Sequence, residues 1–598
     1  MQNIPRQFYL ERSKNIETEL VSLNKAINII SVLRLVSFLF FFASLVLLTF
    51  ISFKIVAWIG IVITISTFFF LVKYHLRLSV LKMLKVKLLE INKNELLYLD
   101  HNFSGFYDGK EFENLMHPYS SDLNLFGHGS LFQYINRTVT SFGKDKLVQS
   151  LINTDIQREA ILKNQQACKE LVEKTEWRQE FQAKGNTANS NRKEIENVLN
   201  WLNEPNIFLG KKKLQLILKF LPFLSISLLI FGYFTKIYAF AELAFTVQII
   251  LVLTYTKFIN KIHEKLSQSF EVLQRYSKLM NLIEGEPFQS EKLKNAQDIL
   301  CTENGSASVQ LKKLSKILQQ FDRRLNILAA FILNGLYMAD LKAVSQLEHW
   351  KLNNSGKLRS WFDALGEFDS TISLSCFAYN NSNYIYPELT ESTIIEGIDI
   401  GHPLIPENKR VANNFSIPEK GCFVILTGAN MAGKSTFLRT IGMNILLGTM
   451  GAPVCAKEFR FCPLPIMTSL SVKDSLFDNE SYFYAELKRL KMIIDELNKG
   501  NQIFILLDEI LKGTNSKDKL SGSKSLLQKF AKFHTSGIVA THDIALSELE
   551  THFPESIKNY SFEVELDGDR LYYDYKLRNG VCKNLNASFL MKKMGITE

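Results

Sequence analysis

Two apolar runs near the start of the chain dominate its hydrophobic pattern. Residues 35–53 and 55–72 contain no charged side chain, and Lys54 separates them. Each run has about the length that a helix needs to cross the hydrocarbon core of a bilayer. The pattern predicts a transmembrane helical hairpin over residues 35–73. A pair of buried helices in a soluble domain is the alternative.

A second apolar pair is less clean. Residues 214–235 contain Lys219 and Pro222, and residues 237–256 contain Glu242. Basic residues flank both pairs on the outside and are sparse within them, which predicts that the N-terminus and the C-terminal domain are cytoplasmic. We therefore expect a multi-pass protein of the inner or plasma membrane with two or four spans. For the second pair, a buried helical hairpin is the alternative.

The remaining pattern divides the chain further. An amphipathic lead (residues 1–34) precedes the first hairpin, and a linker (residues 74–118) follows it. Helical periodicity predicts an α-helical body over residues 119–345, with the second hairpin (214–256) inserted in it. From residue 346 to 598, strand-like runs alternate with helical runs, which indicates an α/β domain with a central sheet. Its predicted strands lie at 393–400, 423–426, 503–507, 537–540, 560–566 and 571–577.

A glycine-rich turn lies between a strand-like run and a helical run of the α/β region. The turn, Thr427-Gly-Ala-Asn-Met-Ala-Gly-Lys-Ser-Thr436, has the spacing of a phosphate-binding loop, or Walker A motif. Its backbone N–H groups and the positive end of the following helix would face an anion. Lys434 would reach the β and γ phosphates of ATP, and Ser435 would ligate Mg²⁺. The predicted nucleotide-binding residues here are Gly428, Ala429, Asn430, Met431, Ala432, Gly433, Lys434, Ser435 and Thr436.

The ends of two further predicted strands carry residues that would complete an ATP-hydrolysing site. The run 503–507 ends in Asp508 and Glu509; we predict Asp508 as the second Mg²⁺ ligand and Glu509 as the group that polarises the attacking water. A solvated acidic pair that closes a strand is the alternative. The next strand ends at Thr541-His542-Asp543, and His542 is predicted to sense the γ-phosphate, although a lone histidine is more often structural.

These motifs, in this order, resemble the ATPase domain of the MutS family of DNA mismatch-repair proteins. The resemblance lies in the loop with its Asn430-Met431 pair, in Asp508-Glu-Ile510 with Gly513-Thr514, and in Ala540-Thr-His542. Upstream, Gly401-His-Pro403 and Val411-Ala-Asn413 resemble the adenine-side segment of that family. Asn124-Leu-Phe-Gly127 resembles the start of its core and lever domain, and Trp361–Asp369 the last helix before the ATPase.

The resemblance implies a fold and a function. The fold would be an ABC-like α/β P-loop ATPase (MutS domain V) preceded by a helical core and lever domain. The function would be Mg²⁺-dependent ATP hydrolysis at the interface of a homodimer, with DNA as the partner. Val411 and Asn413 would lie on the adenine side, and Ser481 would reach across to the nucleotide of the second subunit.

Departures from the family pattern limit what the resemblance implies. The first apolar hairpin stands where mismatch-reading members carry an N-terminal domain, and the second stands where the family inserts its DNA clamp. Leu511-Lys512 replaces Gly-Arg, and Arg410 replaces an aromatic residue that stacks on adenine. Strict mismatch recognition is therefore less expected than ATP binding and hydrolysis.

Composition and the remaining motifs separate the alternatives. The seven cysteines form no C-x-x-C pair, so neither a zinc site nor a disulfide framework is indicated. The net charge of +10 is compatible with DNA or anionic lipid and proves neither. The alternative function is an ABC-transporter-like ATPase coupled to membrane helices or a protein partner. Its signature would be Leu520-Ser-Gly-Ser-Lys524, but this segment follows the acidic strand instead of preceding it.

Overall fold

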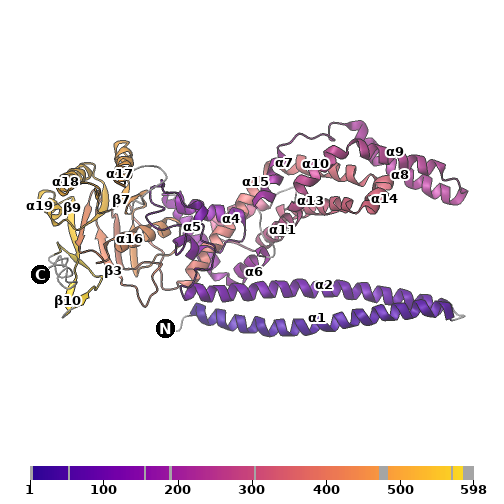
Figure 1. Cartoon of the computed structure of the whole chain (residues 1–598), viewed down its shortest axis with the longest axis horizontal. Helices are drawn as coiled ribbons and strands as arrows, with labels where there is room; N and C mark the ends of the chain where they lie inside the picture. Colours follow the sequence, from indigo (N-terminus) through magenta and orange to yellow (C-terminus); the bar gives the residue numbers. More distant parts are fainter. Residues whose placement is uncertain are drawn as a thin grey trace.

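The computed structural model describes residues 4–50, 54–153, 156–186, 192–301, 305–470, 482–567 and 570–582. A long helical hairpin runs beside a helical body, and an α/β domain lies at one end of the molecule (Figure 1). The fold is therefore a helical N-terminal region followed by an α/β domain, as the sequence predicts.

The N-terminal hairpin consists of α1 (Ile4–Phe50) and α2 (Lys54–Leu99), which run side by side (Figure 1). At 1.5 Å per residue each helix is about 70 Å long. The predicted apolar runs form the distal half of this hairpin. Residues 74–99, which the sequence pattern assigns to a linker, continue α2 instead. Cross-helix ion pairs such as Lys93 to Glu17 (2.8 Å) hold this polar half together.

The helical body contains many short helices and one long one. Its elements are η1 (Lys110–Phe112), α3 (Leu131–Ile135), α4 (Ser141–Ile152), α5 (Arg158–Glu173), α6 (Thr175–Gly185), α7 (Arg192–Leu202), α8 (Lys212–Thr235), α9 (Ala239–Thr254), α10 (Thr256–Leu266), η2 (Ser267–Ser269), α11 (Phe270–Gly285), α12 (Glu291–Leu300), α13 (Ala307–Phe321), η3 (Asp322–Leu325), α14 (Ile327–Tyr337) and α15 (Ala339–Asn380). Helix α15 runs through the boundary expected at residue 345, because its buried face continues without a break through Trp361 and Phe377.

An apolar tip projects from this body and is formed by α8, α9 and α14. Within the predicted helical body, the helix is interrupted at η3 and again at Met338, whose φ is +53°. The segment between the breaks, α14, packs against α9, and Gly335 allows the ring of Phe245 to lie against the helix backbone. The tip therefore contains a separate apolar helix, α14, whose boundaries the sequence periodicity does not show.

Several helices have the length and composition of membrane spans. Among the described residues, α1, α2 and α8 qualify singly, and the bent pairs α9 with α10–α11 and α14 with α15 would raise the number to five if each counts as one span. Their apolar windows are mostly exposed, with 6% of the α1 window and 22% of the α8 window buried. The distal end of the N-terminal hairpin and the α8–α9 tip both point away from the α/β domain (Figure 1).

The α/β domain is built on a mixed sheet with the strand order β12-β9-β4-β8-β7-β6. Strands β6 to β9 and β4 are parallel, and β12 pairs antiparallel with β9. A second sheet has the order β1-β5-β2-β3, and β10 and β11 pair antiparallel. The elements are β1 (Glu388–Leu389), β2 (Ile395–Ile400), β3 (Asn413–Ile417), β4 (Phe423–Gly428), α16 (Lys434–Thr449), β5 (Glu458–Phe461), β6 (Ile466–Ser469), α17 (Tyr482–Asn498), β7 (Phe504–Asp508), α18 (Ser516–Lys532), β8 (Ser536–Thr541), η4 (Ile544–Glu548), α19 (Leu549–His552), β9 (Ile557–Phe562), β10 (Glu565–Asp567), β11 (Arg570–Tyr572) and β12 (Leu577–Asn579).

Side chains of the central strands alternate between the two faces of the sheet, and each face is covered by helices. In β4, Val424 and Leu426 face a core shared with α16, whereas Phe423 and Ile425 face a core shared with α17 and α18. Because successive side chains of a strand point to opposite faces, continuous apolar strands require helices on both sides of the sheet.

The α16 side of the sheet is also the side that meets the helical body. Its core includes residues of α3 and of the C-terminal part of α15. Asp122 connects the two parts by polar contacts: its carboxylate accepts hydrogen bonds from the Thr468 hydroxyl (2.6 Å) and the Leu470 N–H (3.0 Å). Its backbone oxygen accepts from Arg439 of α16 (2.9 Å).

Candidate nucleotide-binding site

The glycine-rich turn joins β4 to α16 directly. Gly433 has φ of +101° at the N-cap of α16, a backbone conformation that favours glycine. Met431 has φ of +67° and is 85% exposed. The turn thus leaves the first N–H groups of a 16-residue helix open toward the cleft described below, where the helix dipole favours an anion.

Lys434 is buried at the base of this turn. Its ammonium group donates to the backbone oxygens of Gly428 (2.7 Å) and Ala429 (2.9 Å). Burial lowers the pKa of Lys434, although the Glu509 and Asp508 carboxylates act in the opposite direction. The two carbonyls hold the ammonium group beside the cleft, within reach of an anion bound at the α16 N-terminus.

Ser435 and Asp508 meet at the centre of the site. The Ser435 hydroxyl donates to Oδ2 of Asp508, which lies at the C-terminal end of β7. Burial raises the pKa of Asp508, and the hydrogen bond from Ser435 opposes that change. A hydroxyl oxygen and a carboxylate oxygen in contact are the kind of hard ligands that Mg²⁺ prefers.

Glu509 lies between two cationic or potentially cationic groups. Its carboxylate is 3.3 Å from the Lys512 ammonium and 3.5 Å from Nδ1 of His542. Burial alone would raise the pKa of Glu509, but Lys512, His542 and Lys434 together outweigh burial and hold the pKa below its usual value. The carboxylate therefore stays ionised, as a group that accepts a proton from water must be.

The backbone around Glu509 is fixed by neighbouring elements. Its φ is +48°, and its N–H donates to the Ala540 carbonyl on β8 (2.8 Å). The following loop is held by the Glu486 carboxylate of α17, which accepts from the N–H groups of Leu511 and Lys512. Glu486 is buried and thus positions Lys512 against Glu509.

A cleft of about 390 Å³ lies over these groups. Predicted residues that line it are Val411, Asn413, Asn430, Met431, Gly433, Lys434, Ser435, Thr436 and Glu509. Gly428, Ala429 and Ala432 lie behind the lining, where the first two hold Lys434. His542 and Asp508 contact lining residues without being part of the lining. Ser481 lies outside the described residues.

Three residues that line the cleft were not predicted as site residues from the sequence. His402, Lys409 and Tyr575 also line the cleft, and the Asn413 amide donates to the Tyr575 carbonyl (3.0 Å). Burial, with help from Arg439 and Arg410, lowers the pKa of His402 to about 4. His402 belongs to the Gly401-His-Pro403 segment and could have been chosen, whereas nothing local marks Tyr575. Arg410 donates to the Tyr384 hydroxyl (2.9 Å) and does not line the cleft.

The described residues contain no group of three or more His, Cys, Asp or Glu side chains that could hold a metal. The Ser435 hydroxyl and the Asp508 carboxylate are two adjacent oxygen groups. A pair of this kind would suit Mg²⁺, which usually keeps waters and takes phosphate oxygens as further ligands.

The fold and this site together define a helical protein with a C-terminal α/β domain whose acidic, basic and hydroxyl groups converge at the carboxyl ends of β4, β7 and β8. Comparison with known proteins identifies a relative of the α/β domain. The MutS domain V family model matches residues 424–593, which assigns this part of the chain a similarity to MutS domain V.

Individual relatives agree with this assignment. The DNA mismatch repair protein MutS of Thermotoga maritima is 30% identical over 234 residues, which are 38% of this chain and 28% of that protein. The human MutS protein homolog 4 is 28% identical over 235 residues, 38% of this chain and 24% of that protein. MutS of Thermodesulfovibrio yellowstonii is 28% identical over 313 residues, 50% of this chain and 34% of that protein. The chain thus spans about a quarter to a third of the length of these relatives.

Proposed function

We propose that this protein is a membrane-anchored MutS-like ATPase that binds and hydrolyses Mg²⁺-ATP and engages DNA. The observation that carries the proposal is the convergence of Lys434, Ser435, Asp508 and Glu509 on one cleft from separate strand ends. Relatives with MutS names support the same function at the level of the family. They do not favour the transporter-like alternative.

In this proposal each side chain has a defined role. The turn from Gly428 to Gly433 and the N-terminus of α16 bind the phosphates, and Lys434 leaves the Gly428 and Ala429 carbonyls to contact them. Ser435 and Asp508 would hold Mg²⁺, which supplies charge stabilisation at the phosphoryl oxygens. Glu509 accepts the proton of the attacking water, and His542, 3.5 Å from Glu509, would sense the γ-phosphate.

The adenine side of the nucleotide would lie against Val411, Asn413 and the missed residues His402 and Tyr575. His402 is neutral at physiological pH because of its low pKa, so it adds no charge to this wall. Tyr575 packs over Gly433, since a Cβ added there would lie 3.1 Å from its ring. The adenine base would thus bind between the neutral His402 ring and the aliphatic side chain of Val411.

We further propose a homodimer in which Ser481 of one subunit completes the site of the other. The resemblance to the family supports this arrangement, and α17 supports it geometrically. This helix begins at Tyr482 and carries Glu486, which holds the loop beside Glu509. A partner's nucleotide bound near residue 481 would therefore act on the catalytic loop through α17.

The membrane part of the proposal places the spans at residues 35–73 and 214–256, with α14 beside the second pair. Both apolar tips point in the same direction, away from the α/β domain (Figure 1), so one bilayer could receive both. The domains would then be an N-terminal lead (1–34), a first membrane hairpin, a helical core and lever, and an ATPase that extends to residue 598. The lead and the ATPase would be cytoplasmic, at the inner or plasma membrane.

DNA is proposed as the partner because the named relatives are mismatch-repair proteins. The lever helices, which connect through α15 and Asp122 to α16 and β6, would transmit nucleotide-driven motion to the bound DNA. Branched or duplex DNA held near the membrane fits the position of these helices better than mismatch reading, since apolar hairpins occupy the places of the family's reading and clamp domains.

The test compares three variants of the full-length protein in detergent. Lys434→Ala should abolish ATP binding, measured with a fluorescent nucleotide. Glu509→Gln should keep binding and reduce hydrolysis by about 10²-fold or more. Glu555→Gln, an exposed acid of the same domain, is the control and should behave as wild type. Wild-type turnover by Glu509→Gln would contradict the assigned base.

The DNA part is tested with the binding-competent Glu509→Gln protein. Duplex, mismatched duplex, four-way junction and single-stranded DNA are titrated with ATP and Mg²⁺ over a salt series, because contacts to phosphates alone weaken steeply with salt. A preference for one structure that persists at high salt is expected. Equal, salt-labile binding to all four would remove DNA from the proposal and leave the ATPase intact.

A further inference from the structure

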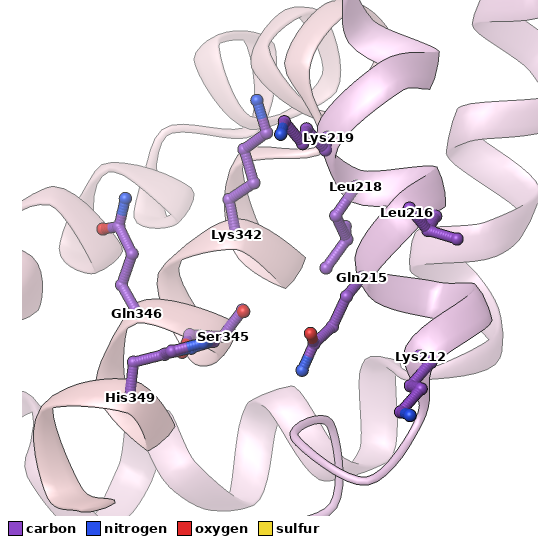
Figure 2. A pocket seen from close by; sticks show the side chains of 9 residues that line it. All are labelled: Lys212, Gln215, Leu216, Leu218, Lys219, Lys342, Ser345, Gln346 and His349. Atoms are coloured by element: carbon purple, nitrogen blue, oxygen red, sulfur yellow. The ribbon is translucent and has the colours of Figure 1, made fainter. Parts of the chain in front are cut away.

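A basic cleft lies at the base of the apolar tip, between the first turns of α8 and the start of α15 (Figure 2). Its volume is about 530 Å³. Lys212, Gln215 and Lys219 come from α8, and Lys342, Ser345 and His349 come from α15. On each helix the spacing is i, i+3, i+7, so each helix presents one continuous face to the cleft.

The cleft carries positive charge that the protein does not neutralise. Its lining contains no Asp or Glu. Among the described residues, no ion pair involves Lys212, Lys219 or Lys342. Lys342 instead lies over the ring of Tyr337 at 3.4 Å, and Lys219 lies over Phe220 at 5.6 Å. In Figure 2 the Lys219 and Lys342 side chains extend toward the same end of the cleft, where two ammonium groups repel each other unless an anion lies between them.

The acidic residues of α15 near the cleft, Asp340 and Glu348, interact with other groups of the protein. Asp340 is 3.6 Å from Nε of Arg324. Glu348 is buried and accepts from the N–H groups of Ile207, Phe208 and Leu209 in the loop before α8. The charge of the cleft is therefore left for a ligand, and the Ser345 hydroxyl and the His349 ring offer further polar contacts beside it.

The position of the cleft indicates what this anion is attached to. Lys219 marks the end of the polar part of α8, and the residues after it are apolar and exposed, for example Phe220 and Phe223. Lys212 lies seven residues earlier, about 10 Å along the helix. The cleft thus lies at the boundary where the proposed span α8 would enter the bilayer, and lysines at such a boundary lie at the level of lipid headgroups.

We propose that this cleft binds the phosphate headgroup of an anionic phospholipid, whose acyl chains lie along the exposed apolar face of α8. The proposal rests on the membrane placement proposed above. A nucleic acid is a poorer fit, because a duplex is gripped by cations spaced along its backbone, whereas these cations gather in one cleft beside an apolar surface. Because α15 continues into the core beside the ATPase, lipid bound here contacts the same helix that carries the ATPase connection.

The experiment measures lipid retained by the full-length protein in detergent, titrated with phosphatidylglycerol or with phosphatidylcholine and analysed by native mass spectrometry. Wild type should retain phosphatidylglycerol preferentially. Lys212→Gln/Lys219→Gln/Lys342→Gln should weaken that retention by about tenfold or more. The control Lys213→Gln/Lys257→Gln/Lys316→Gln removes the same charge from exposed lysines outside the cleft and should change it by less than about twofold.

A second pair of variants guards against loss of folding. Ser345→Glu places a carboxylate in the cleft and should abolish the preference, whereas Ser360→Glu, exposed on the same helix, should not. The lipid site is overturned if the cleft variants and their controls lose retention equally, or if wild type shows no preference. It is also overturned if inorganic phosphate or duplex DNA displaces the lipid at equal concentration, since the ligand would then be a free anion or a nucleic acid.

Membrane fractionation of the same proteins separates the two proposals. Wild-type protein recovered in the soluble fraction would refute the membrane anchor. Protein that stays in the membrane while the cleft variants bind lipid as wild type does would refute only the lipid site.

Discussion

A buried ion pair attaches the N-terminal hairpin to the helical body, and breaking it should be strongly destabilising. Glu95 of α2 and Arg137 of the loop before α4 make two contacts of 3.1 Å, and both side chains are 5% exposed. The Asn380 amide donates to Glu95 at 2.6 Å, and the Arg137 guanidinium lies 3.4 Å from the centre of the Tyr98 ring. The pair therefore joins α2, the loop before α4 and the C-terminal end of α15.

The expected magnitude follows from this burial. Glu95→Ala leaves the Arg137 guanidinium buried without its counter-charge, which costs about 3–5 kcal/mol. Arg6 and Asp100, at the open end of the same hairpin, form a 2.8 Å pair that is 41% and 50% exposed. Arg6→Ala should therefore cost at most about 1 kcal/mol, since water and salt screen an exposed pair.

The assay is thermal unfolding of the detergent-solubilised protein at a fixed heating rate, followed by tryptophan fluorescence. Trp177, Trp201 and Trp361 lie in the helical body and report on it. Glu95→Ala should lower the apparent Tm by roughly 5 °C, since the helical region that unfolds is large. Glu95→Leu/Arg137→Met, which removes both charges, should recover much of this loss. A Tm for Glu95→Ala no lower than that of Arg6→Ala would refute the reasoning.

Three further predictions concern the α/β domain. The pKa of His402 falls from 6.5 to about 4 on folding, so the unfolded chain binds more protons between these pH values. Stability should then rise from pH 4 to 6.5 by about 3 kcal/mol; denaturant titrations should show a flatter profile for His402→Gln, and an identical profile would contradict the assignment. Gly433→Ala puts a Cβ at φ of +101° and 3.1 Å from the Tyr575 ring, so it should cost about 1–2 kcal/mol and weaken nucleotide binding. The control Gly356→Ala, in open space within α15, should be neutral or stabilising, and equal effects of the two would exclude strain as the cause. Asp122→Ala leaves the Leu470 N–H without its acceptor and should cost about 2–4 kcal/mol; unchanged thermal stability and ATPase activity would show that this contact does not join the two parts.

The network around Glu95 also bears on how the proposed ATPase communicates with the membrane. Tyr9 of α1 donates to Asn380 (2.9 Å), and Asn380 donates to Glu95. Asn380 is the last residue of α15, just before the strands of the α/β domain. A movement of this helix end upon nucleotide binding would therefore act on both helices of the N-terminal hairpin.

Local sequence determined most of the chemistry of the candidate nucleotide site. The order strand, Gly428 to Gly433, Lys434, Ser435 specifies a turn and helix start through glycine conformation and helix geometry, which depend on neighbours in the chain. The convergence of Asp508, Glu509 and His542 could be predicted because the carboxyl ends of parallel strands meet at one edge of a sheet. The apolar runs of α1, α2 and α8 were likewise visible, because continuous hydrophobicity requires no partner to be recognised.

Tertiary structure decided what depends on residues far apart in sequence. Tyr575 reaches the cleft only because the segment between β11 and β12 lies against Gly433. The isolation of α14 depends on packing against Phe245, and the length of α2 beyond residue 73 depends on pairing with α1. Lys512 is set beside Glu509 by Glu486 of another helix. The three lysines of the basic cleft lie on two helices more than a hundred residues apart, so their unneutralised charge becomes one site only when α8 and α15 pack together.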